Sequence, residues 1–218
     1  MKNLVVAIDG PAGAGKSTVA QLAAKKLGYT YIDTGAMYRA VAWKTLQQKK
    51  DVTDELILEV VKDIDVDLQY QDGKTTVAVD GTDVTGEIRT PEVSAIVSQV
   101  AALGPVREKM VDLQRKMGER GSVLMDGRDI ATNVLPNADV KIFLTASIEE
   151  RARRRHKELT EKGYTIDMEQ MKADIAARDK ADSEREISPL VQAEDATLLD
   201  TTGLSIDEVV ERILSMCK

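Results

Sequence analysis

The chain has very few cysteine, histidine and aromatic residues. Its 218 residues include one cysteine, one histidine, one phenylalanine and one tryptophan. A single cysteine excludes a disulfide framework, and one cysteine with one distant histidine cannot form a Cys/His zinc site. We expect Cys217 to lie at a frayed carboxyl end, and His156 to be a surface or packing residue rather than a general base.

Long hydrophobic runs and an excess of basic residues are also absent. No apolar stretch approaches the length of a membrane helix, and Asp9 interrupts the first apolar run too early for a secretory signal. The net charge of −7 opposes broad nucleic-acid binding, which requires a basic surface. We therefore expect one cytoplasmic, monomeric domain over residues 1–218, with no membrane or nucleic-acid partner.

A complete phosphate-binding motif is present near the amino terminus. Residues 10–18 read G-P-A-G-A-G-K-S-T, between an apolar run at 4–8 and a helical pattern that ends at Gly28. In such a loop, backbone N–H groups and the helix amino terminus bind phosphate, the lysine reaches the outer phosphates, and the serine hydroxyl holds Mg²⁺. The motif predicts a bound nucleoside triphosphate. The residues expected to contact it are Gly10, Pro11, Ala12, Gly13, Ala14, Gly15, Lys16, Ser17 and Thr18.

Strand patterns alternate with helical patterns along the chain. This order predicts an α/β protein of the P-loop NTPase fold, with a five-stranded parallel sheet flanked by helices. The expected strands cover residues 4–8, 30–32, 123–125, 140–144 and 197–199. The expected helices cover residues 17–27, 36–47, 93–103, 106–119, 148–161, 168–185 and 206–215. Ser147 and Ser205, each followed three residues later by a glutamate, are expected to form capping boxes.

One stretch, at about residues 65–84, interrupts this alternation. It has period-two patterns on both sides of Asp72-Gly73, and a second turn begins at Asp80-Gly81. An Asp-Gly pair between alternating segments is a hairpin signal. We expect a small antiparallel β insertion here, and the residues alone leave its role in substrate binding open.

Arginines and carboxylates gather where a second anion could bind. Asp33-Thr34-Gly35 leads to Arg39 at a helix start, and Asp126-Gly127-Arg128-Asp129 follows a predicted strand. Ligand residues of open α/β sheets collect at the carboxyl ends of strands, and arginine pairs well with phosphate oxygens. A helical stripe with spacings of three and four residues joins Met171, Ile175, Arg178, Asp182 and Arg185. Surface ion pairs among these charged residues are the alternative interpretation.

A basic cluster, Arg151-Ala152-Arg153-Arg154-Arg155, lies near the start of the helix expected at 148–161. Cations there oppose the helix dipole, so local stability does not account for them. We expect residues 147–165 to form a helical lid over the triphosphate, with Arg151, Arg154 and Arg155 in contact with it. A solvated basic face or an RNA-contacting strip is the alternative. A switch GTPase is disfavoured, because no Asn-Lys-x-Asp guanine-binding sequence follows the phosphate loop.

Taken together, these residues resemble the nucleoside monophosphate kinases, and among them the bacterial cytidylate kinase family. The similarity extends over essentially the whole chain. The matching segments are 8–11, 33–39, 86–90, 98–101, 126–129, 141–144 and 178–179. Asp-Gly-Arg-Asp at 126–129, Gly-Glu-Ile-Arg at 86–89 and the inserted sheet are far more specific than the phosphate loop. The resemblance implies a core with a mobile lid at 147–165 and a monophosphate-binding region at 36–104 that includes the insertion.

The resemblance also implies the residues that would bind a nucleoside monophosphate. It places cytosine near Ser98, Arg107 and Asp129, and ribose near Arg178 and Asp182. It places the phosphate near Thr34, Arg39, Arg128 and Arg185. A carboxylate can accept a hydrogen bond from the exocyclic amine of cytosine, whereas uracil has an oxygen there that the carboxylate would repel.

The implied reaction transfers the γ-phosphoryl group of ATP to CMP or dCMP, giving ADP and CDP or dCDP. The acceptor phosphate is already anionic, so catalysis requires alignment and cations rather than a general base. We expect Lys16, Arg128 and Arg178 to be catalytic and Ser17 to hold Mg²⁺. Asp126 is expected either to act on Mg²⁺ through water or to be a structural carboxylate. The alternatives are a kinase for UMP or a non-nucleotide acceptor, and an ATP-gated RNA-binding module.

Overall fold

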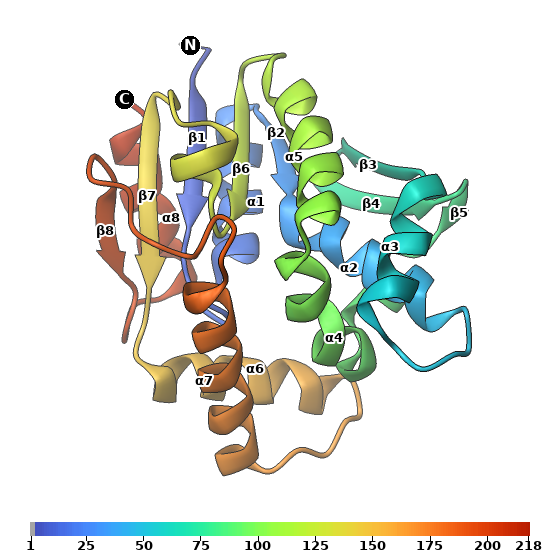
Figure 1. Ribbon diagram of the computed structural model, residues 1–218. Coiled ribbons are helices and arrows are strands. Elements are labelled where there is room, and N and C mark those ends of the chain that lie inside the picture. The colour runs from blue at the N-terminus through green and yellow to red at the C-terminus, as the bar shows by residue number, and fades with distance from the viewer. Residues whose placement is uncertain (1–2) are drawn as a thin grey trace.

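The centre of the protein is a five-stranded sheet in which all neighbouring strands are parallel. The computed structural model describes residues 3–218 and orders these strands β2-β6-β1-β7-β8 (Figure 1). They are β1 (Val5–Asp9), β2 (Thr30–Asp33), β6 (Val123–Gly127), β7 (Val140–Thr145) and β8 (Thr197–Asp200). All five predicted strands are confirmed. Each continues one or two residues beyond its predicted end, because the residues there, although they lack apolar side chains, still pair with the neighbouring strand.

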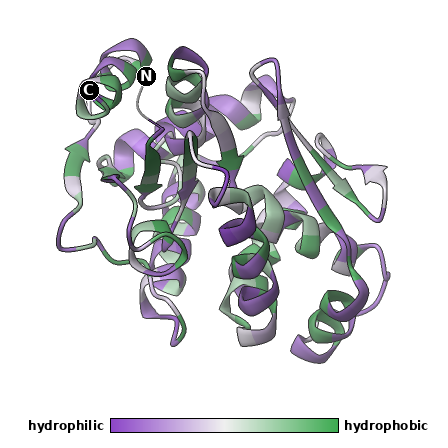
Figure 2. Cartoon of the chain, turned by 90° about the horizontal axis from the view of Figure 1, so that it is seen from above, coloured by the Kyte–Doolittle hydropathy of each residue, from purple (hydrophilic) through white to green (hydrophobic). Residues whose placement is uncertain are grey.

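The central strands are buried on both faces, which is why they read as unbroken apolar runs. In β1, Val6 and Ile8 belong to a core shared with helices α1 and α8, whereas Ala7 faces a second core that includes Val111 of α5. Seen from above, the hydrophobic colour concentrates on these strands (Figure 2). The layers of the predicted P-loop fold are therefore present.

The seven predicted helices are confirmed within two residues at each end. They are α1 (Lys16–Leu27), α2 (Thr34–Leu46), α4 (Pro91–Ala102), α5 (Gly104–Gly118), α6 (Ile148–Glu161), α7 (Met168–Glu184) and α8 (Ile206–Met216). The capping box of Ser205 with Glu208 is present. Ser147 accepts a hydrogen bond from the backbone of Glu150, but the Glu150 carboxylate instead accepts hydrogen bonds from Arg153 and Arg154.

Three helical segments were not predicted. The helix α3 (Asp54–Asp63) begins at Thr53, whose hydroxyl caps Leu56, and it buries Leu56, Ile57 and Val61. The sequence alone could have indicated this helix, through the capping residue Thr53 and the helical spacing of its apolar residues. The short 3₁₀ turn η1 (Glu87–Arg89) and the π-helical turn η2 (Ile130–Val134) have no comparable signal.

The inserted antiparallel sheet is confirmed. Its strands are β3 (Val66–Gln71), β4 (Lys74–Val79) and β5 (Thr82–Asp83). Both Asp-Gly pairs have positive φ at each residue, the backbone geometry of a tight hairpin turn. Buried valines of this sheet pack in one core with helices α2, α3, α4 and α5, so the insertion forms part of a second layer beside the central sheet (Figure 1).

The expectation of a frayed carboxyl end is wrong. The helix α8 packs against α1, and its Val209, Val210 and Ile213 are buried. Cys217, directly after this helix, is 9% exposed and belongs to the same core. Within residues 3–218, no helix is long and apolar enough to cross a membrane.

Candidate active site

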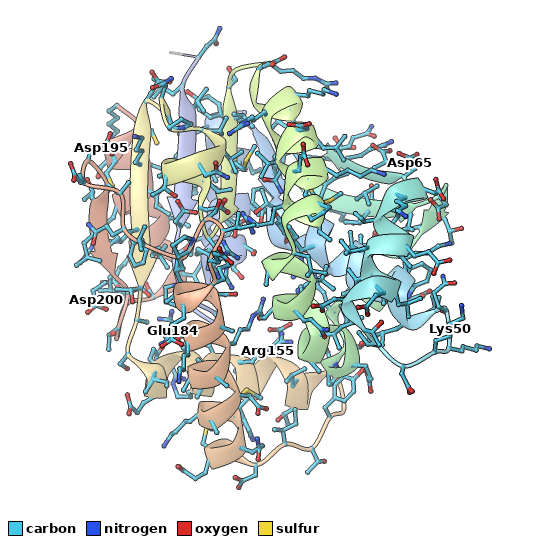
Figure 3. The ribbon with its side chains drawn as sticks, in the orientation of Figure 1. Lys50, Asp65, Arg155, Glu184, Asp195 and Asp200 are labelled. Atoms are coloured by element: carbon cyan, nitrogen blue, oxygen red, sulfur yellow. The ribbon has the colours of Figure 1, made fainter. Side chains whose placement is uncertain are left out.

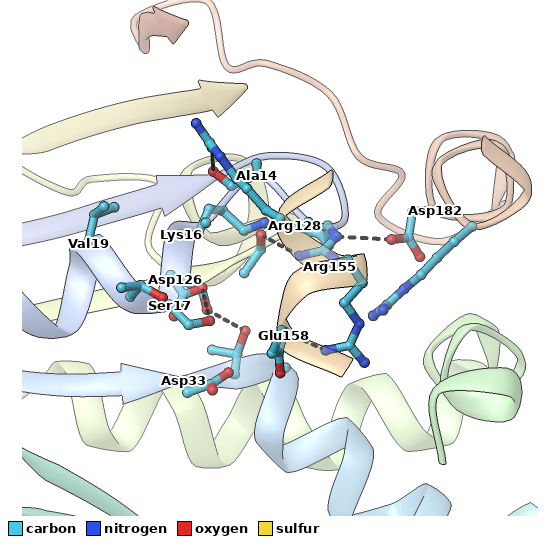
Figure 4. Close-up of a pocket in the computed structure, with 18 of the residues that line it drawn as sticks. Ala14, Lys16, Ser17, Val19, Asp33, Asp126, Arg128, Arg155, Glu158 and Asp182 are labelled. Atoms are coloured by element: carbon cyan, nitrogen blue, oxygen red, sulfur yellow. Dashed lines mark hydrogen bonds and ion pairs between the residues drawn. The ribbon is translucent and has the colours of Figure 1, made fainter. Parts of the chain in front are cut away.

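A cavity of about 670 Å³ collects most of the residues predicted to bind ligands. It extends from the phosphate loop, past the ends of β2 and β6, to helices α4 and α5, and helices α6 and α7 line its other side (Figure 4). Because β1, β2 and β6 are parallel neighbours, their carboxyl ends open on one edge of the sheet. The predicted triphosphate and second-anion residues thus share one cavity.

The phosphate loop supplies the first end of this cavity. Gly15 precedes α1 with φ 86°, and no side chain caps the helix amino terminus, so the dipole and the first N–H groups are available to a phosphate. Lys16 Nζ donates to the carbonyl oxygens of Gly10, at 2.7 Å, and Pro11, at 2.8 Å. Burial and the nearby Arg128 lower the pKa of Lys16, and the carboxylates of Asp126 and Asp9 only partly oppose this shift.

Gly10, Pro11 and Ala12 do not line the cavity, whereas Gly13 to Thr18 do. Gly10 has a packing role instead, because a Cβ there would lie 1.9 Å from the carbonyl oxygen of Leu144 in β7. Gly81 also has positive φ, but a Cβ on it would meet nothing within 4 Å.

We expect Gly10→Ala to lower the free energy of unfolding by about 3 kcal/mol, because the backbone of β7 cannot give way cheaply. Gly81→Ala, which adds only backbone strain, should cost about 1 kcal/mol. Urea denaturation of the two variants measures both values. Equal losses would contradict the packing role of Gly10.

Polar side chains that suit Mg²⁺ meet beside the loop. Asp126, at the end of β6, accepts hydrogen bonds from Ser17 Oγ at 3.2 Å and from Tyr31 Oη at 2.6 Å. Burial and the nearby Asp33 raise the pKa of Asp126, so a cation there would be favourable. No cluster of three or more acidic, histidine or cysteine side chains in residues 3–218 could hold a metal alone. This set fits Mg²⁺, which commonly uses one or two carboxylates together with substrate phosphates.

Four arginines converge in the middle of the cavity. They are Arg39, Arg128, Arg155 and Arg178, from α2, the segment after β6, α6 and α7. Burial and Arg128 lower the pKa of Arg178 to about 10, and burial with Arg178 and Arg155 lowers that of Arg39. Arg178 Nε is buried without a hydrogen-bond partner. Such an excess of positive charge is costly unless anions bind among these groups.

Asp182 and Thr34 are already engaged beside this cluster. Asp182 Oδ2 accepts from Arg128 Nε at 2.9 Å, and burial, which would raise the pKa of Asp182, is outweighed by Arg128 and Arg178. Thr34 Oγ1 donates to the carbonyl oxygen of Asp126 at 2.8 Å, so its proton is not free for a phosphate in this conformation. Both residues line the cavity.

The far end of the cavity holds a buried polar group around Asp129. Its carboxylate is paired with Arg107, and Arg185 Nη2 lies 3.7 Å from its other oxygen. Arg107 also lies over the ring of Tyr38, 5.4 Å from the centroid. Ser98 of α4 lines the same end. The structure therefore brings together the three residues expected at the base, and adds Tyr38 to them.

The arginines of α6 do not share one environment. Arg154 and Arg155 both line the cavity. Arg155 points from α6 toward α4 (Figure 3), and its Nη2 lies 3.4 Å from Ser94 Oγ of α4. Arg151 does not line the cavity. Its buried guanidinium donates to Ala12 O at 2.9 Å and to Asp179 at 2.6 Å. The structure thus gives Arg151 a supporting role on the phosphate loop in place of the expected contact with ATP.

The expectation that local interactions do not account for this basic cluster also needs correction. Arg153 and Arg154 pair with Glu150 at 2.8 Å, and Arg155 pairs with Glu158 at 2.7 Å. Glutamates in the same helix offset the charges that oppose its dipole.

Sequence reasoning missed Asp33, Tyr38 and Arg89 as cavity residues. Arg89 Nη2 donates to Asp33 Oδ2 at 2.6 Å, which joins η1 to the end of β2. The position of Asp33 at a strand end was a usable signal. Arg89 lies 56 residues from Asp33, so its contact depends on the tertiary structure.

The parallel sheet, the phosphate loop and the arginine-lined cavity beside it define a P-loop protein built to hold two anionic groups close together. A solved structure of an uncharacterized protein from Eubacterium ventriosum has a related fold, with a TM-score of 0.55 at 12% identity, over 98% of this chain and 97% of that one.

The family model described as cytidylate kinase matches residues 6–218. A cytidylate kinase of Bacillus cereus (strain ATCC 10987 / NRS 248) is 55% identical over 216 residues, which cover 99% of this chain and 96% of the relative. One of Bacillus thuringiensis (strain Al Hakam) matches at the same identity and coverage. The chain belongs to the cytidylate kinase family.

Proposed function

We propose that this protein transfers the γ-phosphoryl group of ATP to CMP or dCMP, producing ADP and CDP or dCDP. Family membership supports the reaction. The observation that carries it is the cavity itself, in which a phosphate loop and a buried carboxylate–arginine pair occupy opposite ends, with four arginines between them. Such a product belongs to pyrimidine nucleotide metabolism. The expectations of a monomer and of a cytoplasmic location stay predictions.

We assign ATP to the loop residues that line the cavity, together with Arg154 and Arg155. Lys16, Arg128 and Arg178 would stabilise the charge that develops on the transferring group, because all three line the cavity and are buried or only partly exposed. Neither phosphate needs to lose a proton, so the absence of a nearby histidine is consistent with the reaction.

Ser17 and Asp126 would hold Mg²⁺, Ser17 directly and Asp126 through water. The positive charge that Mg²⁺ supplies when bound would neutralise part of the charge on the phosphates of ATP. The Tyr31 hydroxyl keeps the Asp126 carboxylate aimed toward Ser17.

We assign CMP to the rest of the cavity. Asp129, Arg107 and Ser98 would bind the base, Asp182 and Arg178 the ribose, and Arg39, Arg128, Arg185 and Thr34 the phosphate. Residues 36–104 would form the monophosphate-binding region. Residues 147–165 would form a lid, in which α6 carries Arg154 and Arg155 over the phosphates.

The test of this assignment is the choice of acceptor. We expect Asp129→Ala to lower kcat/KM for CMP about 30-fold, mostly through KM, because it removes a charged hydrogen bond to the exocyclic amine. The kcat/KM for UMP should fall much less in the same variant. A coupled ADP-release assay with ATP and all the nucleoside monophosphates measures this preference.

Asp139→Ala is the control, because Asp139 is another hydrogen-bonded aspartate, which accepts from Val5 N–H of β1, but it is not a cavity residue. Unchanged CMP turnover in Asp129→Ala would favour another acceptor, such as UMP or a non-nucleotide. Salt-sensitive RNA retention that depends on Arg154 and Arg155, without CMP turnover, would favour an ATP-gated RNA-binding module.

A further inference from the structure

Asp129, the carboxylate assigned to the base, lies at the start of a π-helical turn. Asp129 immediately precedes η2, and both Asn133 N–H and Val134 N–H donate to its carbonyl oxygen, at 2.9 and 3.1 Å. Single π-helical turns are rare and are frequently found at functional sites. Two side chains outside the cavity lining, Asp9 and Asn133, bond directly to this turn and to Asp129.

Asp9 anchors the start of the turn to the central strand. It is the last residue of β1 and directly precedes the phosphate loop, and it is 2% exposed. Its Oδ1 accepts from Ile130 N–H and its Oδ2 from Ala131 N–H, both at 2.8 Å. With both oxygens bonded to successive N–H groups, the carboxylate fixes where the chain leaves Asp129.

The charge state of Asp9 fits this role. Burial raises its pKa to about 6, although the two backbone N–H groups oppose that shift. Among the charged groups that face it, Asp129 raises the pKa further and Lys16 lowers it. At neutral pH Asp9 is therefore mainly ionised and can accept both hydrogen bonds.

Asn133 acts on the Asp129 carboxylate itself. Its Nδ2 donates to Asp129 Oδ2 at 3.0 Å, and Arg107 Nη2 donates to the same oxygen. For the other oxygen, Oδ1, the nearest ion-pair contact is with Arg185 Nη2 at 3.7 Å, which is longer than a hydrogen bond. Two donors on one oxygen fix the rotation of the carboxylate and leave Oδ1 as the acceptor for a ligand.

We propose that Asp9 and Asn133 are positioning residues that orient Asp129, so that Oδ1 meets the exocyclic amine of the bound base. Asp9 holds the backbone of the turn, and Asn133 holds the side chain. This inference rests on the proposed function, because it requires Asp129 to recognise cytosine. It also links the strand that carries the phosphate loop to the residue that selects the acceptor.

Asn133→Ala tests the side-chain part. We expect kcat/KM for CMP to fall about tenfold, through KM for CMP, with KM for ATP within twofold of wild type. The preference for CMP over UMP should fall with it. Gln170→Ala is the control, since Gln170 makes a comparable 2.7 Å hydrogen bond to Asp174, four residues away on the exposed face of α7, and should change neither value.

Asp9→Asn tests the backbone part, because an amide can accept only one of the two N–H groups and presents a donor to the other. We expect a similar loss of CMP preference. Asp139→Asn is its control, since Asp139 Oδ2 accepts from Val5 N–H at 2.8 Å on the same strand. Thermal unfolding of each variant shows whether it is folded, and Asn133→Ala tests the proposal even where Asp9→Asn does not fold.

The same measurements in an Asp129→Ala background separate this inference from the proposed function. If both residues act through Asp129, adding Asn133→Ala to Asp129→Ala should change the CMP:UMP ratio no further. A wild-type ratio in Asp129→Ala alone would overturn the proposed function. A low ratio in Asp129→Ala with a wild-type ratio in folded Asn133→Ala, or an effect of Asn133→Ala on KM for ATP alone, would overturn this inference.

Discussion

Lys16→Met is expected to lower kcat for CMP phosphorylation about 10³-fold. Lys16 of the phosphate loop is 5% exposed. Without a ligand, its ammonium group donates two hydrogen bonds to backbone carbonyl oxygens of the loop. When the triphosphate is bound, the same group can reach the transferring phosphate, where a fixed positive charge is most useful in the transition state. Methionine keeps an unbranched apolar side chain, one heavy atom shorter than lysine, and removes the charge and the hydrogen-bond donors.

The measurement is a coupled ADP-release assay at saturating ATP and CMP. Burial already lowers the pKa of Lys16, so the charge does not stabilise the free protein and Lys16→Met should fold normally. Lys26→Met is the control on the same helix, because Lys26 is exposed and pairs with Glu211 of α8. A kcat within tenfold of wild type in folded Lys16→Met would contradict the catalytic role.

Arg178→Met is expected to lower kcat about 10²-fold and, at the same time, to stabilise the ligand-free protein. The guanidinium faces three other arginines across the cavity, and its Nε has no partner. The lowering of its pKa from 12.5 to about 10 corresponds to about 3 kcal/mol of unfavourable energy. Because the side chain lines an open cavity, solvent screening reduces this, and we expect a gain of about 2 kcal/mol.

Urea denaturation without ligand measures the gain, and the ADP-release assay measures the loss. The sign follows from the pKa. Arg178 stays protonated at neutral pH in both the folded and unfolded protein, so the cost of burying its charge is present throughout that range and disappears when the charge is removed. Lys180→Met is the control, because Lys180 is exposed on the same helix, and it should change neither quantity by much. A lower free energy of unfolding in Arg178→Met would contradict this prediction, because it would show that the Arg178 guanidinium stabilises the ligand-free fold.

The two predictions share a cause. A site for two polyanions must carry more positive charge than the free protein can neutralise, and here Lys16, Arg39 and Arg178 all have lowered pKa values. Stability is therefore lower than it would be without these groups, and ligand binding should recover the difference.

Much of the fold could be predicted because its signals are local. The run at 4–8, the loop at 10–18 and the Asp-Gly turns at 72 and 80 each fix the backbone through neighbouring residues, and all were confirmed. The helix α3 was missed although Thr53 and its spacing indicated it, so that omission was one of interpretation. The π-helical turn after Asp129 could not be predicted, because the carboxylate that anchors its start, Asp9, lies 121 residues from Ile130 in the sequence.

In the candidate site, too, some features follow from local sequence and others depend on the tertiary structure. By itself, the sequence determined that a phosphate loop is present, because this motif depends on residue types at fixed spacing. Its resemblance to known proteins indicated the family of the chain. Only the tertiary structure decided that Arg151 supports the loop from behind while Arg155 reaches the cavity, and that Gly10 packs against β7. The physical reason is that a side chain's role depends on which partners it meets, and these partners come from segments that only the packed sheet and helices bring together.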